Sequence, residues 1–380
     1  MNTIHYIGVD DAELQLFESQ YALPDGMCYN SYLIEGNKIA IMDSVDARKA
    51  DEWLYNVQQA LRNRLPQYLI LQHMEPDHSG SVNAFLKLYP QTIVVCSAKA
   101  QTLMTQFGIV PENIQLVKEN DLLDLGGLTL RFFMAPMVHW PEVMMTYCEQ
   151  EQVLFSADAF GKFGIYHADR DDWACEARRY YFNICGKYGT PVTLALKKVA
   201  SLPLQAICPL HGPVLEGEQM TEALRLYNIW SSYDVETPGV LIAHASIHGN
   251  TAKAAEKLAK MLQQRGIGKV AITDLCRDDM AEAIEDAFRM DRMVVCASSY
   301  DNNVFPPMHM FLWELLQKGY QNRKVAIVEN GSWAPSAGRE MKALLETMKN
   351  ITIIEPMVTI RGSITDETNN QLETLANNLC

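Results

Sequence analysis

The stretch from His73 to His78 places four side chains that can bind metal within six residues, in the order His-Met-Glu-Pro-Asp-His. It follows an apolar run at 68–72 that is typical of a buried strand. Alternate residues of an extended segment point the same way, so we expect His73, Glu75 and Asp77 to converge on one point, with His78 beside them. Imidazoles and carboxylates together suit iron, manganese or zinc. The alternative is a polar loop whose histidines only form hydrogen bonds.

Three further candidate ligands each follow an apolar run that is typical of a strand. They are His139 after 130–135, Asp158 after 153–157 and His211 after 206–210. Loops at strand ends hold functional side chains on a rigid scaffold. The set of four histidines and three carboxylates is too large for one ordinary catalytic zinc ion, whereas two metal ions would use it all. A carboxylate has two oxygen atoms, so we expect Asp158 to bridge two ions.

From Pro238 onward the pattern becomes strand, loop and helix, repeated. Three successive loops after apolar strands carry small polar residues, glycine and an aromatic residue. The candidate binding residues of these loops are Ser246, His248, Gly249, Asn250 and Thr251, then Ser298, Ser299, Tyr300, Asp301, Asn302 and Asn303, then Asn330, Gly331, Ser332 and Trp333. A Gly-containing loop that leads into a helix suits a phosphate group, although one such loop alone is equally consistent with an ordinary turn. Doubly wound parallel sheets bind ligands outside their strand carboxyl ends, where these three loops lie.

The metal motif resembles that of the metallo-β-lactamase superfamily, and its Glu75 variant is similar to the flavodiiron proteins (A-type flavoproteins, class A). The resemblance implies an αββα sandwich with a diiron site in residues 1–237 and a flavodoxin-like, doubly wound parallel sheet that binds FMN in residues 238–380. It assigns His73, Glu75 and His139 to the flavin-proximal iron and Asp77, His78 and His211 to the second iron. Asp158 would bridge the two.

Two residues depart from the pattern of this family. His248 stands where flavodiiron proteins often have Tyr, and Pro335 stands where they usually have Trp. Stacking on the flavin is therefore expected from Trp333 or from Tyr300. In the segment 178–184, which resembles the family's diiron pocket lining, Tyr180 and Tyr181 are interpreted as packing residues. For Tyr181, the alternative is a pocket residue that donates a proton or hydrogen bond.

Composition fits a two-domain protein of 380 residues, with a polar segment at 230–239 as the expected linker. The net charge of −14 argues against a nucleic-acid partner. No apolar run approaches the roughly 20 residues that span a bilayer, and the first residues lack the features of a signal peptide. The nine cysteines include no Cys-x-x-Cys pair and fit reduced thiols, so we expect a cytoplasmic protein without a fused rubredoxin module.

The resemblance implies an oxidoreductase that reduces O2 to water, NO to N2O, or both, with a slight preference for O2 expected. Its electrons would come from a separate donor such as rubredoxin, or from reduced coenzyme F420. A head-to-tail homodimer, or a dimer of dimers, would place the FMN of one subunit against the irons of the other. Two alternatives remain: a dinuclear zinc hydrolase with a regulatory flavodoxin-like domain, and a flavodoxin-like electron carrier or sensor with a structural metal domain.

Overall fold

The computed structural model describes residues 3–167 and 173–380, and the chain divides into two compact units, Met1–Asn228 and Ile229–Cys380. The expected linker at 230–239 is mostly regular structure. Helix α7 (Gly217–Ser232) and strand β17 (Thr237–Ala245) leave only 233–236 between them. The domain boundary at 237/238 stays a prediction. In the described part of the chain, no helix is long and apolar enough to cross a membrane.

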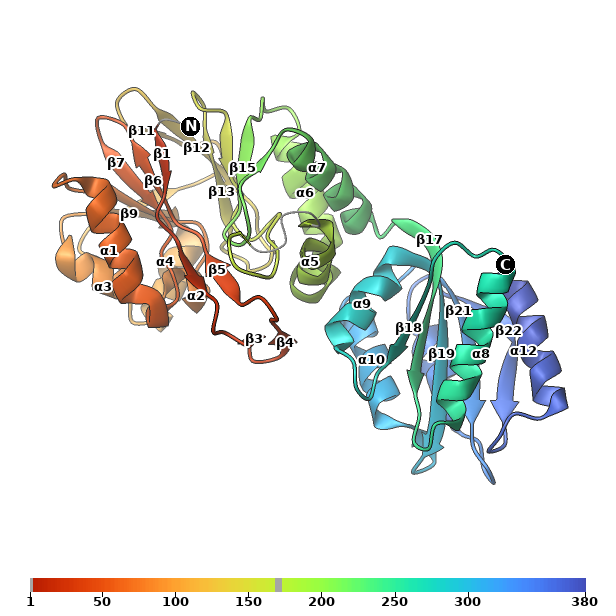
Figure 1. Cartoon of the computed structure of the whole chain (residues 1–380). Helices are drawn as coiled ribbons and strands as arrows, with labels where there is room; N and C mark the ends of the chain where they lie inside the picture. The colour runs from red at the N-terminus through yellow and green to blue at the C-terminus, as the bar shows by residue number, and fades with distance from the viewer. Residues whose placement is uncertain (1–2, 168–172) are drawn as a thin grey trace. The chain divides into compact units, whose positions relative to one another are not determined.

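The first unit is built on two six-stranded sheets that pack face to face (Figure 1). The first sheet has the order β1-β6-β7-β8-β9-β10, and its strands are Ile4–Tyr6, Tyr32–Glu35, Ile39–Met42, Tyr68–Leu71, Ile93–Ser97 and Ile114–Val117. The second has the order β11-β12-β13-β14-β15-β16, with strands Leu122–Asp124, Thr129–Met134, Met144–Cys148, Val153–Phe155, Ala206–Cys208 and Leu215–Glu216. Two small ribbons pair β2 (Val9–Asp11) with β5 (Met27–Tyr29), and β3 (Leu16–Phe17) with β4 (Tyr21–Ala22).

Helices cover the outer faces of the two sheets, with α1 and α3 on the side of the first and α6 and α7 on the side of the second (Figure 1). The helical segments before α7 are η1 Ala47–Lys49, α1 Ala50–Leu61, α2 Pro76–Ser79, α3 Val82–Leu88, α4 Ala98–Gln106, α5 Trp173–Tyr180, η2 Tyr181–Cys185, η3 Gly186–Tyr188 and α6 Gly189–Val199. The αββα sandwich of metallo-β-lactamase type, predicted from the resemblance, is confirmed.

The apolar strands form the core between the two sheets. Ile70 and Val95 of the first sheet lie in one buried cluster with Phe132 and Phe155 of the second. Every residue of β8 and of β14 is buried, because a helix layer covers one face and the opposite sheet the other. Strands with two covered faces need continuous apolar sequence, which explains the apolar runs before the motif residues.

Strand directions bring the expected ligands to one edge. Strand β12 is antiparallel to β13, and β13 is antiparallel to β14, so β12 and β14 run the same way. Strand β15 is parallel to β14. The carboxyl ends of these three strands therefore lie at one edge of the second sheet, where His139, Asp158 and His211 follow them.

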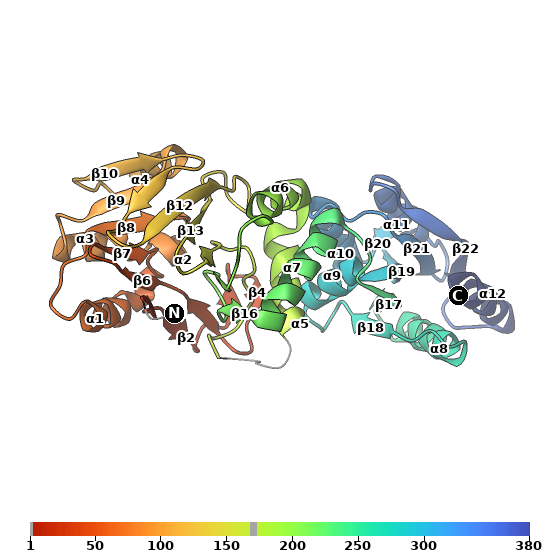
Figure 2. The same ribbon diagram turned by 90° about the horizontal axis from the view of Figure 1, so that it is seen from above.

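The second unit is a five-stranded parallel sheet of order β18-β17-β19-β21-β22, which is the flavodoxin-like order. Its further strands are β18 Val270–Asp274, β19 Met290–Tyr300, β20 Asn303–Val304, β21 Lys324–Asn330 and β22 Thr352–Ile360, with β20 antiparallel on β19. Its helices are α8 Asn250–Gln264, α9 Met280–Arg289, α10 Pro306–Gln317, α11 Ala337–Glu346 and α12 Asp366–Leu379. Helices α8 and α12 cover one face and α9, α10 and α11 the other (Figure 2). The predicted doubly wound sheet is confirmed.

Candidate metal centre and candidate cofactor cavity

All seven expected ligands of the first unit lie together in two groups. Each residue contributes one possible ligand atom, and within a group these atoms all lie within 4.8 Å of one another. The proximal group is His73, Glu75, His139 and Asp158, and the distal group is Asp77, His78 and His211. Six of the seven side chains are buried, and Glu75 is partly exposed. Such a concentration of buried ionisable groups is costly unless their charges compensate one another or bind a cation.

In the proximal group, imidazole nitrogens face carboxylate oxygens at short range. His73 Nε2 lies 3.2 Å from Glu75 Oε2 and 3.1 Å from Asp158 Oδ2. His139 Nε2 lies 3.0 Å from Glu75 Oε2 and 3.2 Å from Asp158 Oδ2. Two nitrogens and two carboxylates therefore point at one small volume, an arrangement that suits a borderline divalent metal ion.

In the distal group, two imidazoles point at each other. His78 Nε2 and His211 Nε2 are 3.1 Å apart, and each lies 3.3 Å from Asp77 Oδ2. Two neutral imidazole nitrogens at this distance place their lone pairs together unless a proton or a cation lies between them. His211 is held by its other nitrogen, because Nδ1 lies 2.7 Å from the backbone carbonyl oxygen of Cys28. That contact requires a proton on Nδ1 and leaves Nε2 free as a ligand.

Asp158 lies between the two groups and turns one oxygen toward each. Its Oδ2 faces His73 and His139, while its Oδ1 lies 3.3 Å from His78 Nε2 and 3.7 Å from His211 Nε2. Within the described part of the chain, neither oxygen of Asp158 accepts a hydrogen bond of good geometry, and the same is true of both oxygens of Asp77. Buried carboxylate oxygens without donors are the atoms that a metal ion would satisfy.

One geometric expectation for the motif was wrong. His73 and Glu75 converge, but Asp77 does not join them, because Pro76 begins the one-turn helix α2. Proline is favoured at a helix start, since its fixed φ suits the helix and no N–H is lost there. The turn carries Asp77 and His78 away from Glu75 and into the distal group.

The carboxylates raise the basicity of the imidazoles in this site. Burial disfavours the charged form of His139, but the adjacent Asp158 and Glu75 carboxylates outweigh burial and raise the pKa of His139 to about 9. Burial likewise disfavours charge on His73, yet the Asp158 carboxylate raises the pKa of His73 well above its ordinary value. Burial alone would raise the pKa of Asp158, but the neighbouring imidazolium groups lower it well below its usual range. Without a bound cation, the proximal group is therefore a set of imidazolium–carboxylate pairs at neutral pH.

Aromatic rings pack beside His211. The Tyr180 ring lies 5.6 Å from it and the Phe17 ring 5.5 Å, both measured between centroids. Tyr181 is buried in the π-helical turn η2, where its ring contacts Phe182 and Tyr227. Tyr180 is thus the better pocket candidate of the tyrosine pair, because a one-residue step on a helix changes direction by about 100°. Phe17 comes from a distant hairpin, and no local sequence signal marks it.

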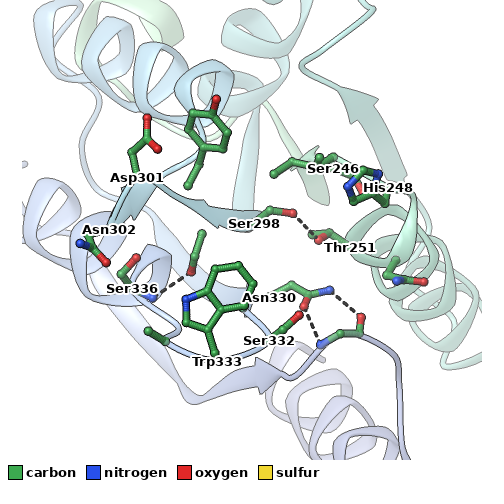
Figure 3. Close-up of a pocket in the computed structure, with 17 residues that line it drawn as sticks. Ser246, His248, Thr251, Ser298, Asp301, Asn302, Asn330, Ser332, Trp333 and Ser336 are labelled. Carbon is green, nitrogen blue, oxygen red and sulfur yellow. Dashed lines mark hydrogen bonds between the residues drawn. The ribbon is translucent and has the colours of Figure 1, made fainter.

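The second unit contains a cavity of 450 Å³ at the carboxyl ends of its strands (Figure 3). Of the predicted binding residues, thirteen line it: Ser246, His248, Asn250, Thr251, Ser298, Ser299, Tyr300, Asp301, Asn302, Asn330, Gly331, Ser332 and Trp333. The volume lies within the range of small-molecule and cofactor sites. No lysine or arginine is among the residues that line this cavity, so an anion there would depend on hydroxyls, backbone N–H groups and the start of α8.

Hydrogen bonds fix the loops around this cavity. Ser246 Oγ accepts from the Gly249 N–H at 3.1 Å, and the Thr251 and Ser298 hydroxyls are 2.9 Å apart, as Figure 3 shows for the second pair. Ser299 Oγ accepts from the Ser336 N–H at 2.8 Å. Trp333 is 90% exposed, so its indole is available to a ligand. The cavity is therefore formed by fixed loops and one unpacked aromatic side chain.

Two predicted contact residues do not line the cavity, and four unpredicted ones do. Gly249 precedes α8 with φ of +84° and shapes the turn, while Asn303 pairs with Tyr300 in the short ribbon of β20. The additional lining residues are Ile247, Ala334, Ser336 and Gly362. Gly362 follows the fifth strand, β22, so the rule that loops at strand carboxyl ends bind ligands could have found it.

Comparisons with known proteins agree with this architecture. Residues 27–212 match the ODP family of beta-lactamase proteins. The chain is 30% identical to the anaerobic nitric oxide reductase flavorubredoxin of Vibrio vulnificus over 356 residues, which cover 90% of this chain and 72% of the relative. It is 29% identical to an uncharacterised protein of Methanocaldococcus jannaschii over 317 residues, 82% of this chain and 79% of that protein.

Solved structures share the fold of the whole chain. The rubredoxin oxygen:oxidoreductase of Desulfovibrio gigas has a TM-score of 0.93 at 24% identity, over 100% of this chain and 96% of that one. A flavodiiron protein of Giardia intestinalis has a TM-score of 0.89 at 21% identity, over 100% and 95%. At these identities the similarity shows the fold alone.

Binding of metal ions to the metal-free protein should release protons. Because the pKa of His139 is raised to about 9, this imidazole is protonated at pH 7 and must lose its proton before it can bind a metal ion. Ferrous iron added without oxygen in weak buffer should acidify the solution more at pH 7 than above pH 9, and the iron affinity should fall as the pH falls. The His139→Ala variant, measured by pH-stat in the same way, should release fewer protons. Equal release at both pH values would contradict this prediction.

The Thr251→Val variant should bind FMN about tenfold more weakly, because it removes a hydroxyl next to the expected phosphate position at nearly constant volume. Quenching of flavin fluorescence on titration into the flavin-free protein measures this affinity. Riboflavin, which lacks the phosphate, should bind the variant and the original protein equally. An equal loss for the two flavins would instead indicate a general distortion of the cavity.

Proposed function

This chain belongs to the flavodiiron protein family, and on that premise we propose that it is an oxidoreductase that reduces O2 to water, NO to N2O, or both. The observation that carries the proposal is the placement of Asp158, with one oxygen toward each of two ligand groups. A single metal ion would leave one of these groups without a cation. The arrangement supports a dinuclear centre that Asp158 bridges.

The residues present fit two iron ions. His73, Glu75 and His139 would hold the proximal ion, and Asp77, His78 and His211 the distal one. Buried carboxylate oxygens without hydrogen-bond donors and the facing imidazoles of the distal group support this assignment. Mixed imidazole and carboxylate ligation is suited to iron, and Glu75 in place of a histidine favours iron over a zinc hydrolase centre.

FMN is the flavin we propose for the cavity of the second unit. When bound, two ferrous ions and a reduced FMN would together hold four electrons, enough for O2 to become two water molecules, and the ions alone would hold two, enough to couple two NO molecules. The protein's own contribution is to hold the metal ligands in place and to restrict the access of water to the metal centre. Five of the seven ligands lie in loops that follow strands, and Asp77 and His78 lie on the short helix α2. The rings of Phe17 and Tyr180 pack beside His211 and would limit the access of water there.

The electron donor is proposed to be a separate protein or cofactor, such as rubredoxin or reduced coenzyme F420. This sequence contains no Cys-x-x-Cys pair, and a rubredoxin iron site needs four cysteine ligands. No disulfide joins cysteines in the part of the chain that the structure describes. The flavorubredoxin relative is named for nitric oxide reduction, and the present chain spans only part of its length. Our expectation of a slight preference for O2 stays a prediction.

Protein produced with iron available should contain about two iron ions and one FMN per chain, measured together by metal analysis and flavin extraction. With one electron donor, turnover with O2 should exceed turnover with NO. Asp158→Ala should reduce either activity at least as much as Glu75→Ala, because loss of a bridge affects both ions, and both variants should keep their FMN. Zinc with hydrolase activity, or full activity in the Asp158 variant, would contradict the proposal.

A head-to-tail homodimer, alone or paired into a tetramer, is proposed to bring FMN and metals together, since the cavity and the metal centre lie in different units. Complementation tests it: Glu75→Ala is mixed with a chain that carries Asn250→Asp and Thr251→Ala. After random subunit exchange, half of the dimers are mixed and hold one intact pair, so about a quarter of the original activity should return. No recovery after demonstrated exchange, or a fully active monomer, would count against it.

A further inference from the structure

A buried carboxylate outside the ligand set contacts the proximal group from behind. Glu142 Oε1 lies 2.8 Å from His73 Nδ1, and both side chains are fully buried. The same oxygen accepts from the Met74 N–H at 2.9 Å. The second oxygen, Oε2, has no hydrogen-bond partner within the described residues. A buried carboxylate with so few donors requires a nearby positive charge.

The position of Glu142 is fixed by the fold. It lies just before β13, and its backbone carbonyl accepts from the Ser97 hydroxyl at 2.9 Å. Ser97 ends β9 and caps α4, so Glu142 is tied to the sheet that also carries His73. The Trp140 ring packs on the His73 ring with centroids 5.3 Å apart and planes at 89°. The imidazole is therefore held on two sides.

Among the described residues, no equivalent carboxylate contacts the distal imidazoles from behind. His211 donates to a neutral backbone carbonyl, and His78 Nδ1 has no hydrogen-bond partner in the part of the chain that the structure describes. An anionic acceptor withdraws proton density from an imidazole N–H more strongly than a carbonyl does, and makes the opposite nitrogen a better electron donor. The environments behind the two metal groups are thus unequal.

We propose that Glu142 is a positioning residue that fixes His73 with its proton on Nδ1 and selectively strengthens metal binding at the proximal position. The proposal rests on the dinuclear centre proposed above and extends it. In this assignment the negative charge of Glu142 acts on the proximal ion through its ligand His73. Removing that charge should therefore affect one of the two bound metal ions and leave the other unchanged.

The experiment is an oxygen-free titration of metal-depleted protein with ferrous iron, followed by equilibrium measurement of both binding steps. In Glu142→Gln, the amide oxygen can still accept from His73 but the charge is gone. We expect one equivalent to bind about 10- to 100-fold more weakly, with the other unchanged. Glu142→Leu, which also removes the hydrogen bond, should weaken the same equivalent further. Glu329→Gln, which neutralises a buried carboxylate of the second unit, should bind iron as the original protein does.

The affected position is identified in a His211→Ala background, which disables the distal group. There, Glu142→Gln should weaken the remaining equivalent by the same factor. Unchanged binding of both equivalents, or an equal loss of both, would overturn the role of Glu142. If the original protein does not bind two ions, the dinuclear centre fails instead, so the two outcomes are separable. FMN content and circular dichroism confirm that each variant is folded, and Glu142→Gln decides the matter if the leucine variant does not fold.

Discussion

Buried charges in the first unit must be compensated within a few ångströms, and the loops of that unit are arranged around this requirement. Asp158 is the centre of the arrangement, because its two oxygens face two different sets of imidazoles. Two of the imidazoles are in turn restrained from behind, His211 by the backbone carbonyl of Cys28 and His73 by the Glu142 carboxylate. In a low-dielectric interior, loss of one member leaves its partners uncompensated, so the set acts as a unit.

The two sheets make this charge cluster possible. The candidate ligands follow the carboxyl ends of four strands, β8, β12, β14 and β15, and every residue of β8, β14 and β15 is buried. The apolar layers supply the burial energy, and the strand ends supply positions that cannot move without disturbing that packing. The second unit applies the same geometry to another ligand class. There the strand ends carry mostly hydroxyls, amides and glycine, with Asp301 as the acidic residue of the lining. Hydroxyl and amide groups suit a phosphate bound by hydrogen bonds.

Local sequence patterns predicted the ligands themselves but not their grouping. The types and spacing of His73 to His78 indicated metal binding, and the apolar runs indicated which strands would present the other ligands. The division into two groups depends on the helical turn that Pro76 begins. An alternation rule for extended chains cannot anticipate such a turn. Similarly, Gly249 belonged to the expected phosphate loop, yet its part is to turn the backbone beside the cavity and not to line it.

The sequence by itself determined which residue types were available for chemistry, the two-part organisation, the αββα and doubly wound folds, and the resemblance to flavodiiron proteins. The residue types and the two-part organisation follow from composition, periodicity and motif spacing, which are local properties of the chain, whereas the αββα fold was implied by the resemblance. The sequence also predicted that Asp158 would bridge two ions. Only the tertiary structure decided that Tyr180 packs on His211 and that Glu142 lies behind His73. Glu142 and His73 are separated by 69 positions in the chain. Such pairs form only when packed sheets bring distant strand ends together, and no local pattern encodes that distance.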